Sequence, residues 1–571
     1  MATSPSTAGQ REAALRAIHK NPRTQVVIVG GGINGIATFR DLALQGVEVV
    51  LVERADFASG ASAASSHMVH GGIRYLENGE FRLVHESVTE RNDLLKTAPH
   101  FVKPLKTTVP IYHFWSGLLQ APLKFVFGRK GKPAERGAAL IKIGLTIYDL
   151  FVGPGRRTPW HRFRGQVASL RELPRLNPKV KYTATYFDAS MHDPERLALD
   201  VLNDALESSR SAHALNYVEA TGFTGTGVTL TDRETGESFA IEADAVINAT
   251  GPWADLTNEA LGKPTRFMGG TKGSHIVLDN PELVAATGGR EIFFEHSDGR
   301  IVLIYPLKGR VMVGTTDLAA DPAEPALCTE EEVDYFLDLI GDVFPDIAVS
   351  RKQIVYRFSG IRPLPASDAS STGQISRDYR VVVDSSRGIP LVTLVGGKWT
   401  TFRALGETLS DVVLDLIGVP RATSTKHRPI GGGRDFPMSP RARGVWLRSR
   451  IPGAGTRGNV LLNRYGTRAA AVWDTIEAEH DEPLAGDRLS TRELAWMVDH
   501  EHVVHLVDVI LRRTDLAFTG SVTYELLARV AAALAPLLGW DEERISREID
   551  ATANELREAH GVALGTEAAH A

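Results

Sequence analysis

The sequence predicts an α/β protein (α+β overall) in three parts: an open-sheet domain assembled from separated segments, a domain with an antiparallel sheet, and an all-helical C-terminal domain. An apolar run near the N-terminus ends in glycines, residues 301–315 are typical of a β-hairpin, and beyond residue 445 apolar residues recur at helical spacing. The expected ranges are 25–100, 190–265 and 355–420 for the first domain, 101–189 and 266–354 for the second, and 445–571 for the third.

Composition excludes several kinds of protein. The chain has 571 residues with 64 basic and 69 acidic side chains, and a formal charge of −5 is no sign of a nucleic-acid binder. The single cysteine, Cys328, excludes an intrachain disulfide and a thiolate-held zinc or iron–sulfur site within one chain. The N-terminus lacks the apolar region of a secretory signal, and no apolar run is long enough to predict a membrane-spanning helix.

A dinucleotide site is predicted at the N-terminus. The β-branched run Val26–Val29 is typical of a buried parallel strand, and glycines at GxGxxG spacing follow it: Gly30, Gly32 and Gly35. They permit a tight turn, a close approach of the backbone to a pyrophosphate, and close packing of the next helix on the strand. A second strand, Val47–Val52, ends at Glu53, whose carboxylate can accept hydrogen bonds from ribose hydroxyls. The pattern indicates a Rossmann-like domain.

Later glycines favour FAD over NAD as the dinucleotide. The strand 244–248 ends in Ala249-Thr250-Gly251, which resembles a motif common in FAD-binding two-domain oxidoreductases. A third apolar strand ends at Gly396 and Gly397, and residues 57–76 are rich in small residues that can pack against an extended ligand. Three strand-to-glycine junctions spread over almost 400 residues indicate one cofactor domain assembled from separated pieces.

Seven segments together resemble one family. They are SSHMVHGGIRYLENGEFRLV (65–84), KGSHIVL (272–278), YPLKGRVMVGTTD (305–317), FSGIRPL (358–364), ISRDY (375–379), GGKWTTFR (396–403) and DVILRRT (508–514). The chain resembles the FAD-dependent (respiratory, quinone-linked) glycerol-3-phosphate dehydrogenases, within the D-amino-acid-oxidase-like flavoproteins. One departure is His67, where many relatives have lysine.

The resemblance implies a reaction and a set of site residues. Oxidation of sn-glycerol 3-phosphate to dihydroxyacetone phosphate transfers a hydride to flavin N5, and the electrons pass to a membrane quinone. Contacts to FAD are expected at Gly30, Gly32, Asn34, Gly35, Glu53, Ser62, Ser65, Ser66, Ala249, Thr250, Gly251, Gly397, Lys398 and Thr400. Substrate contacts are expected at Arg74, Tyr75, Arg362, Arg377 and Lys398.

A histidine is the expected base, because an imidazole accepts a proton near neutral pH. His70 is the first candidate and His275 the second, while Arg362 and Lys398 are expected to act electrostatically on the phosphate and the developing alkoxide.

Two groups of histidines raise the question of a metal. His67 and His70 form one, and residues 500, 502 and 505 form the other, but neither has a full ligand set. We expect no metal. The second group is interpreted as the exposed face of a helix that begins with a capping box at Ser490 and Glu493.

Charge is uneven along the chain. Residues 101–164 carry twelve basic and two acidic side chains and ten aromatic residues. Because a quinone is dissolved in lipid, we expect the basic and aromatic residues of this segment to dock a cytoplasmic protein on the anionic inner face of the cell membrane. The alternative is a solvated basic surface around an anionic substrate.

Other functions remain open at this point. They are an oxidase that passes the electrons to oxygen, an amine or amino-acid oxidase of the same flavoprotein class, and a flavin-bound binding or sensor protein. The oligomeric state also stays open, with a homodimer as one candidate.

Overall fold

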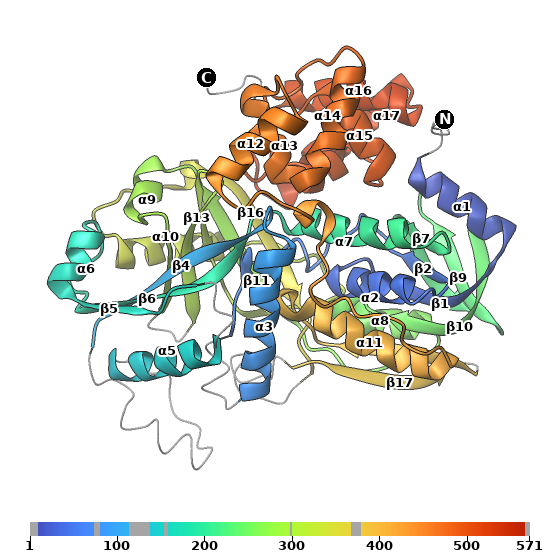
Figure 1. Cartoon of the computed structure of the whole chain (residues 1–571), viewed down its shortest axis with the longest axis horizontal. Coiled ribbons are helices and arrows are strands. Elements are labelled where there is room, and N and C mark those ends of the chain that lie inside the picture. The colour runs from blue at the N-terminus through green and yellow to red at the C-terminus, as the bar shows by residue number, and fades with distance from the viewer. Residues whose placement is uncertain are drawn as a thin grey trace.

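A computed structural model of the chain describes residues 9–72, 80–113, 138–152, 158–296, 300–366, 378–386 and 388–565. Two sheets lie beside each other, and the C-terminal helices, orange to red in Figure 1, cover one side of both. This arrangement confirms the predicted fold class: α/β, with a discontinuous Rossmann-like domain, an antiparallel-sheet domain and a helical C-terminal domain.

Within the described residues, the centre of the first sheet consists of five parallel strands in the order β18-β10-β1-β2-β7. β1 (Arg23–Val29) pairs in parallel with β2 and β10, β10 pairs in parallel with β18, and β2 with β7. An antiparallel strand, β17, closes one edge, and β8 and β9 continue from β10. Their bounds are β2 Val49–Val52, β7 Ala212–Leu215, β8 Val218–Phe223, β9 Gly227–Asp232, β10 Ser238–Asn248, β17 Arg380–Ser386 and β18 Ile389–Val395.

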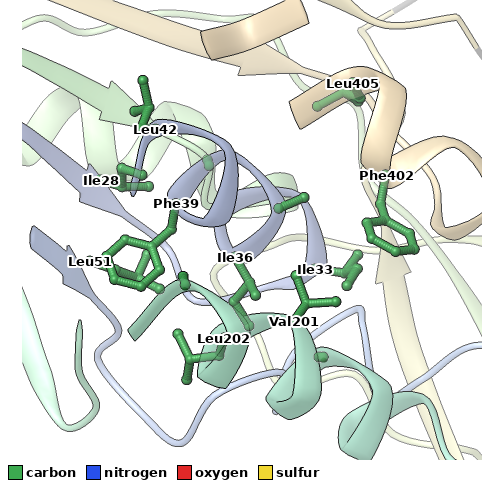
Figure 2. Packing of buried hydrophobic residues seen from close by; sticks show 14 of the residues in the cluster. Ile28, Ile33, Ile36, Phe39, Leu42, Leu51, Val201, Leu202, Phe402 and Leu405 are labelled. Atoms are coloured by element: carbon green, nitrogen blue, oxygen red, sulfur yellow. The ribbon is translucent and has the colours of Figure 1, made fainter. Parts of the chain in front are cut away.

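Helix α2 (Ile33–Leu44) is the centre of the core on this sheet. It lies between the strands, α7 (Pro194–Ser208) and α11 (Phe402–Ile417), and apolar side chains from all of them interdigitate (Figure 2). A Cβ added to Gly406 of α11 would come within 2.9 Å of the Ala37 backbone, so the two helices need a glycine to pack this closely. This packing fixes the N-terminus of α2 relative to β18, the third strand of the predicted cofactor domain that ends in glycines.

The second sheet has ten strands and is mostly antiparallel. Its order is β15-β11-β14-β13-β12-β4-β6-β3, with β16 beside β11 and β5 beside β6. The bounds are β3 Met68–Val69, β4 Val102–Ile111, β5 Arg162–Gly165, β6 Tyr182–Met191, β11 Thr271–Leu278, β12 Glu291–Glu295, β13 Ile301–Leu307, β14 Arg310–Gly314, β15 Leu318–Ala319 and β16 Ile354–Arg362. Because β16 pairs with β11, the predicted segment 355–420 supplies strands to both sheets.

The predicted hairpin over residues 301–315 is confirmed. β13 and β14 pair antiparallel, and their two-residue turn places Lys308 and Gly309 at φ of 52° and 75°. Helices cover the faces of this sheet: α3 (Phe81–Thr97) and α5 (Ala138–Val152) pack on β4 and β6, and α10 (Glu330–Val343) packs on β11, β13 and β14.

The remaining helices complete the chain. They are α1 Gln10–Lys20, α6 Gln166–Glu172, α8 Ala254–Ala260, α9 Pro281–Ala286, α12 Pro440–Arg450, α13 Gly455–Tyr465, α14 Ala469–Ala478, α15 Thr491–His500, α16 Tyr524–Leu538 and α17 Glu542–Glu558. Helices α13 to α17 share a separate apolar core with a short π-helix, η8 (Asp508–Arg513).

The predicted capping box at the start of α15 is wrong. Ser490 is the N-cap residue, but its side chain makes no capping hydrogen bond. Glu493 is buried instead, and its Oε1 accepts hydrogen bonds from Arg464 Nη1 (2.5 Å) and the Tyr465 hydroxyl (3.0 Å). The carboxylate neutralises the charge of the buried Arg464, and an unpaired buried charge costs more free energy than a missing helix cap.

The predicted exposed histidine face is also wrong. Helix α15 ends at His500, and His502 beyond it is buried. His505 lies between two carboxylates, with Nε2 2.9 Å from Glu234 and Nδ1 2.8 Å from Glu548. These hydrogen bonds join the first sheet to the C-terminal domain.

A buried ion cluster also joins the C-terminal domain to the loop after β2. Asp56 accepts hydrogen bonds from Arg512 Nε (2.5 Å), Arg513 Nη1 and Nη2 (2.6 and 2.9 Å) and Asn216 Nδ2 (3.2 Å). Burial acts to raise the pKa of Asp56, but Arg513 and Arg512 outweigh it and hold that pKa well below its usual range. The loop that follows Glu53 is therefore anchored by residues more than 450 positions later.

We predict that Asp56→Ala destabilises the protein by about 3–5 kcal/mol, because it removes the carboxylate that two buried guanidinium groups share, of which Arg512 alone keeps a hydrogen bond to Asp508. Urea unfolding at neutral pH measures the loss. Since the folded-state pKa is lowered, the contribution of Asp56 is present at neutral pH and is lost as the pH falls below about 4, the unfolded-state value. Asp499→Ala, at an exposed position of α15, is the control. Equal unfolding free energies for the two variants would contradict the anchoring role.

Candidate active site

A cavity of about 580 Å³ lies where the carboxyl ends of β1, β2 and β10 meet the second sheet. Twelve of the fourteen residues predicted to contact FAD line it: Gly30, Gly32, Asn34, Glu53, Ser62, Ser65, Ser66, Ala249, Thr250, Gly251, Gly397 and Lys398. Gly35 and Thr400 do not line it. Of the predicted substrate and catalytic residues, His70, His275, Arg362 and Lys398 line the same cavity. Arg74, Tyr75 and Arg377 lie outside the described residues.

Glycines form the floor of the cavity. Gly30 has φ of 110°, and a Cβ there would be 2.8 Å from the backbone of Ala249. A Cβ on Gly35 would be 2.0 Å from the Gly30 carbonyl oxygen, so Gly35 permits α2 to pack on β1 without itself reaching the cavity. Two strand ends that are distant in sequence therefore touch at this point, as parallel pairing of β1 with β10 requires.

The N-terminus of α2 opens on the cavity. Its N-cap, Gly32, has no side chain, and the Ile33 N–H donates to Ser62 Oγ (3.0 Å). The Trp399 indole N–H donates to the Ser62 carbonyl (2.9 Å), which ties the small-residue loop to the third glycine junction. A helix N-terminus with glycine-bounded space beside it suits a pyrophosphate.

Glu53 holds the turn between β1 and the loop after β2. Its Oε2 accepts the Gly31 N–H (2.8 Å) and its Oε1 accepts the Ala55 N–H (3.0 Å). Burial raises the pKa of the carboxyl, against which these two backbone hydrogen bonds act. Its contact with a ribose stays a prediction.

An unsatisfied polar atom supports the fit of a ligand. Asn34 Oδ1 is buried in the lining and has no hydrogen-bond partner within the described part of the chain. A Cβ on Gly397, which has φ of 115°, would lie 2.6 Å from Asn34 Nδ2, so only glycine leaves this space open. Bare glycines, a helix N-terminus and an unpartnered amide oxygen together fit FAD.

Arg362 is held rigidly in the lining. Nη1 donates to Asp317 Oδ1 (2.6 Å), and Nη2 donates to the Thr316 carbonyl (2.7 Å) and Thr315 Oγ1 (3.1 Å). A Cβ on Gly273 would be 2.2 Å from Nη2. The guanidinium therefore lies against β11 at a position where the strand can carry no side chain. Sequence reasoning missed Gly273 and Thr315, although both stand in segments that carry the family resemblance.

His275 is buried beside Arg362. Its Nε2 is hydrogen bonded to Ser66 Oγ (2.8 Å), and its ring stacks on Phe358 with centroids 4.7 Å apart. Burial first, and then the charges of Arg362 and His67, lower the pKa of His275 to about 3. A group with so low a pKa is a weak base at neutral pH.

Lys398 and His70 complete the substrate end. Lys398 extends from the third glycine junction and its Nζ donates to Ser87 Oγ on α3 (3.0 Å). His70 directly follows β3, so the second sheet supplies it while the first sheet supplies Lys398. Among the described residues, no group of three or more histidine, cysteine or acidic side chains is arranged to hold a metal ion.

Comparison with known proteins identifies the family. Residues 25–410 match the family described as FAD dependent oxidoreductase, and residues 423–545 match the C-terminal domain of alpha-glycerophosphate oxidase. A glycerol-3-phosphate dehydrogenase of Synechocystis is 33% identical over 93% of this chain and 96% of its own length. The chain belongs to the FAD-dependent glycerol-3-phosphate dehydrogenase family.

Other relatives agree with this family. A glycerol-3-phosphate dehydrogenase of Pseudomonas aeruginosa is 31% identical, covering 86% of this chain and 91% of the relative. A D-erythritol 1-phosphate dehydrogenase of Brucella abortus is 30% identical, with 85% and 93% covered. The glycerol-3-phosphate dehydrogenase of Bacillus halodurans, solved with FAD, has the same fold with a TM-score of 0.73 and 24% identity, and 96% of this chain and 98% of that chain are covered.

The cofactor of this glycerol-3-phosphate dehydrogenase family member is FAD, as the glycine junctions predict. No helix among the described residues is long and apolar enough to cross a membrane.

We predict that Gly30→Ala abolishes retention of FAD, because its Cβ meets the Ala249 backbone and its φ is unfavourable for alanine. The flavin absorbance of the purified protein relative to its protein absorbance measures the loss. Gly341→Ala, in α10 with open space around its Cβ, is the matched control and should retain the flavin of the parent chain. A yellow Gly30→Ala protein with full flavin content would refute this account of the turn.

Proposed function

We propose that this protein oxidises sn-glycerol 3-phosphate to dihydroxyacetone phosphate and that its electrons pass to a membrane quinone. The observation that carries the proposal is that His70, Arg362 and Lys398 all line the FAD cavity. A phosphomonoester needs cations, and oxidation of a secondary alcohol needs a base within reach of the hydroxyl.

The residues divide the work as follows. His70 takes the proton of the C2 hydroxyl as the C2–H bond breaks and the C=O bond forms. Lys398 and the rigid Arg362 stabilise negative charge on the phosphate and on the developing alkoxide. FAD, when bound, supplies the hydride acceptor at N5. Arg74, Tyr75 and Arg377 remain proposed phosphate contacts.

D-erythritol 1-phosphate is a second candidate substrate, because one relative that covers most of the chain is named as its dehydrogenase. Like glycerol 3-phosphate, a polyol phosphate offers a secondary alcohol and a phosphate dianion to the same cations. An amino acid is a poorer match, since it needs an uncharged amine pocket where Lys398 and Arg362 place positive charge.

A helix within the basic segment supports docking on a membrane. Ile143, Ile147 and Leu150 lie on one exposed stripe of α5, with exposed fractions of 53%, 37% and 65%. Exposed Lys142 flanks this stripe, which lies within the basic, aromatic segment of residues 101–164. An apolar stripe beside basic residues suits the surface of an anionic bilayer, where a quinone is available.

We predict that anaerobic addition of sn-glycerol 3-phosphate bleaches the flavin absorbance of the purified protein. His70→Asn should slow this reduction by about 100- to 10,000-fold, the usual contribution of a general base, whereas His275→Asn should slow it less. Stopped-flow absorbance at saturating substrate measures both. An unbleached parent chain would defeat the proposed function, and bleaching by D-erythritol 1-phosphate alone would reassign the substrate. Peroxide formation during aerobic turnover would identify an oxidase.

We predict that the triple variant Ile143→Gln, Ile147→Gln and Leu150→Gln loses binding to vesicles that contain anionic lipid, because it removes the apolar stripe without changing charge. Flotation with phosphatidylglycerol vesicles measures the bound fraction. Val383→Gln with Leu416→Gln, which removes exposed apolar side chains elsewhere, is the control. Undiminished flotation of the triple variant would refute docking through α5.

A further inference from the structure

A buried polar cluster lies behind the loop that carries His70. It consists of Arg91 on α3, Tyr148 on α5 and Asp188 on β6, each no more than 1% exposed. Arg91 Nη1 and the Tyr148 hydroxyl both donate to Asp188 Oδ1, at 2.8 and 2.6 Å. Arg91 Nη1 also donates to the Tyr148 oxygen (2.6 Å), so the three groups form a closed triangle.

The same carboxylate reaches the active-site loop. Asp188 Oδ1 accepts the backbone N–H of Gly71 (2.9 Å), the residue directly after His70. On the other side of His70, β3 pairs Val69 with Ala189 of β6. His70 therefore lies between two anchors that both come from one short stretch of β6.

Steric contact sets the depth of the loop. A Cβ on Gly71 would be 2.0 Å from the Tyr148 oxygen and 2.7 Å from Val88 of α3. The loop thus lies in direct contact with the cluster, and a larger residue at position 71 would require the loop, Tyr148 or Val88 to move.

Helix α3 connects this anchor to the second cation of the site. Ser87, one turn before Arg91, accepts the hydrogen bond from Lys398 Nζ. Arg91 holds Asp188, and Ser87 holds Lys398, so one helix fixes both sides of the substrate end. Helix α5 lies beside α3 (Figure 1), and it contributes Tyr148 to the buried cluster.

The cluster does not itself touch the cavity. Its three side chains are absent from the lining, whereas His70 and Lys398 belong to it. Burial raises the pKa of Tyr148 well above its usual range, so its hydroxyl keeps its proton as a donor to Asp188. The arginine balances the charge of the buried carboxylate.

We propose that Arg91, Tyr148 and Asp188 are positioning residues that fix the Gly71 backbone and thereby the reactive position of His70. This inference rests on the proposed role of His70 as the base. A base misplaced by a fraction of its working distance transfers a proton slowly, although substrate still binds.

The test compares two buried tyrosines. Tyr148→Phe removes the hydroxyl on which Gly71 rests, and the matched control Tyr186→Phe removes one whose ring packs 6.0 Å from Tyr148. Within the described residues, the Tyr186 hydroxyl makes no hydrogen bond to Asp188 or Gly71. Both variants are purified with FAD, and flavin reduction by sn-glycerol 3-phosphate is followed anaerobically per bound flavin over a range of substrate concentrations.

Tyr148→Phe should lower the reduction rate at saturating substrate by about 10- to 100-fold, the cost of a misplaced catalytic group, with an almost unchanged half-saturating concentration. Tyr186→Phe should retain the parent rate. Dithionite, which needs no base, should reduce both flavins equally. A purely structural defect would change the flavin content or the stability of the protein, whereas the limiting rate per bound flavin would stay the same.

Equal limiting rates for the two variants would overturn the positioning role. Should Tyr148→Phe fail to fold with FAD, Gly71→Ala decides, since it keeps all three side chains of the cluster and disturbs the contact between Gly71 and the Tyr148 hydroxyl; the parent rate in that variant would likewise overturn the inference. A parent chain that sn-glycerol 3-phosphate does not bleach would mark the failure of the proposed function instead.

Discussion

Parallel pairing around β1 is the constraint on which the rest of the structure depends. β10 and β18 come from residues 238–248 and 389–395, yet both run parallel to β1, so their carboxyl ends reach the same edge of the sheet. The Ala249 backbone can then touch Gly30, and Gly397 can touch Asn34, only because neither glycine has a side chain. The FAD cavity is the space that these contacts leave, and the second sheet closes it with Arg362, His275 and His70.

The sequence could predict those parts of the fold that are set by local pattern. A β-branched run before glycines predicts β1 and its turn, and two apolar runs on either side of a turn at Lys308 and Gly309 predict the hairpin of β13 and β14. The same local logic predicts FAD contacts that mostly do lie in the cavity lining, since a glycine at the end of a parallel strand faces the ligand edge. Gly35 is different because it serves the packing of α2 on β1, a role that its position in the motif does not separate from ligand contact.

What the sequence could not predict depends on partners distant in the chain. Glu493 stands where a capping box would use it, but Arg464 needs its charge in a buried core, and a buried guanidinium outweighs a helix cap. His505 joins Glu234 and Glu548 instead of facing solvent. The role of Asp188 could not be predicted for the same reason, because its hydrogen-bond partners Gly71 and Arg91 are both distant from it in the sequence.

The anchoring of Asp56 has a consequence for how the protein is made. Its guanidinium partners are 456 and 457 residues further along the chain. At a translation rate of roughly 5–20 residues per second, Asp56 is synthesised on the order of 20–90 s before these arginines. The β1–β2 unit emerges from the ribosome long before these arginines, so the loop that follows Glu53 reaches its final form only after they have been synthesised. The final form of the nucleotide pocket therefore depends on synthesis of the C-terminal helical domain.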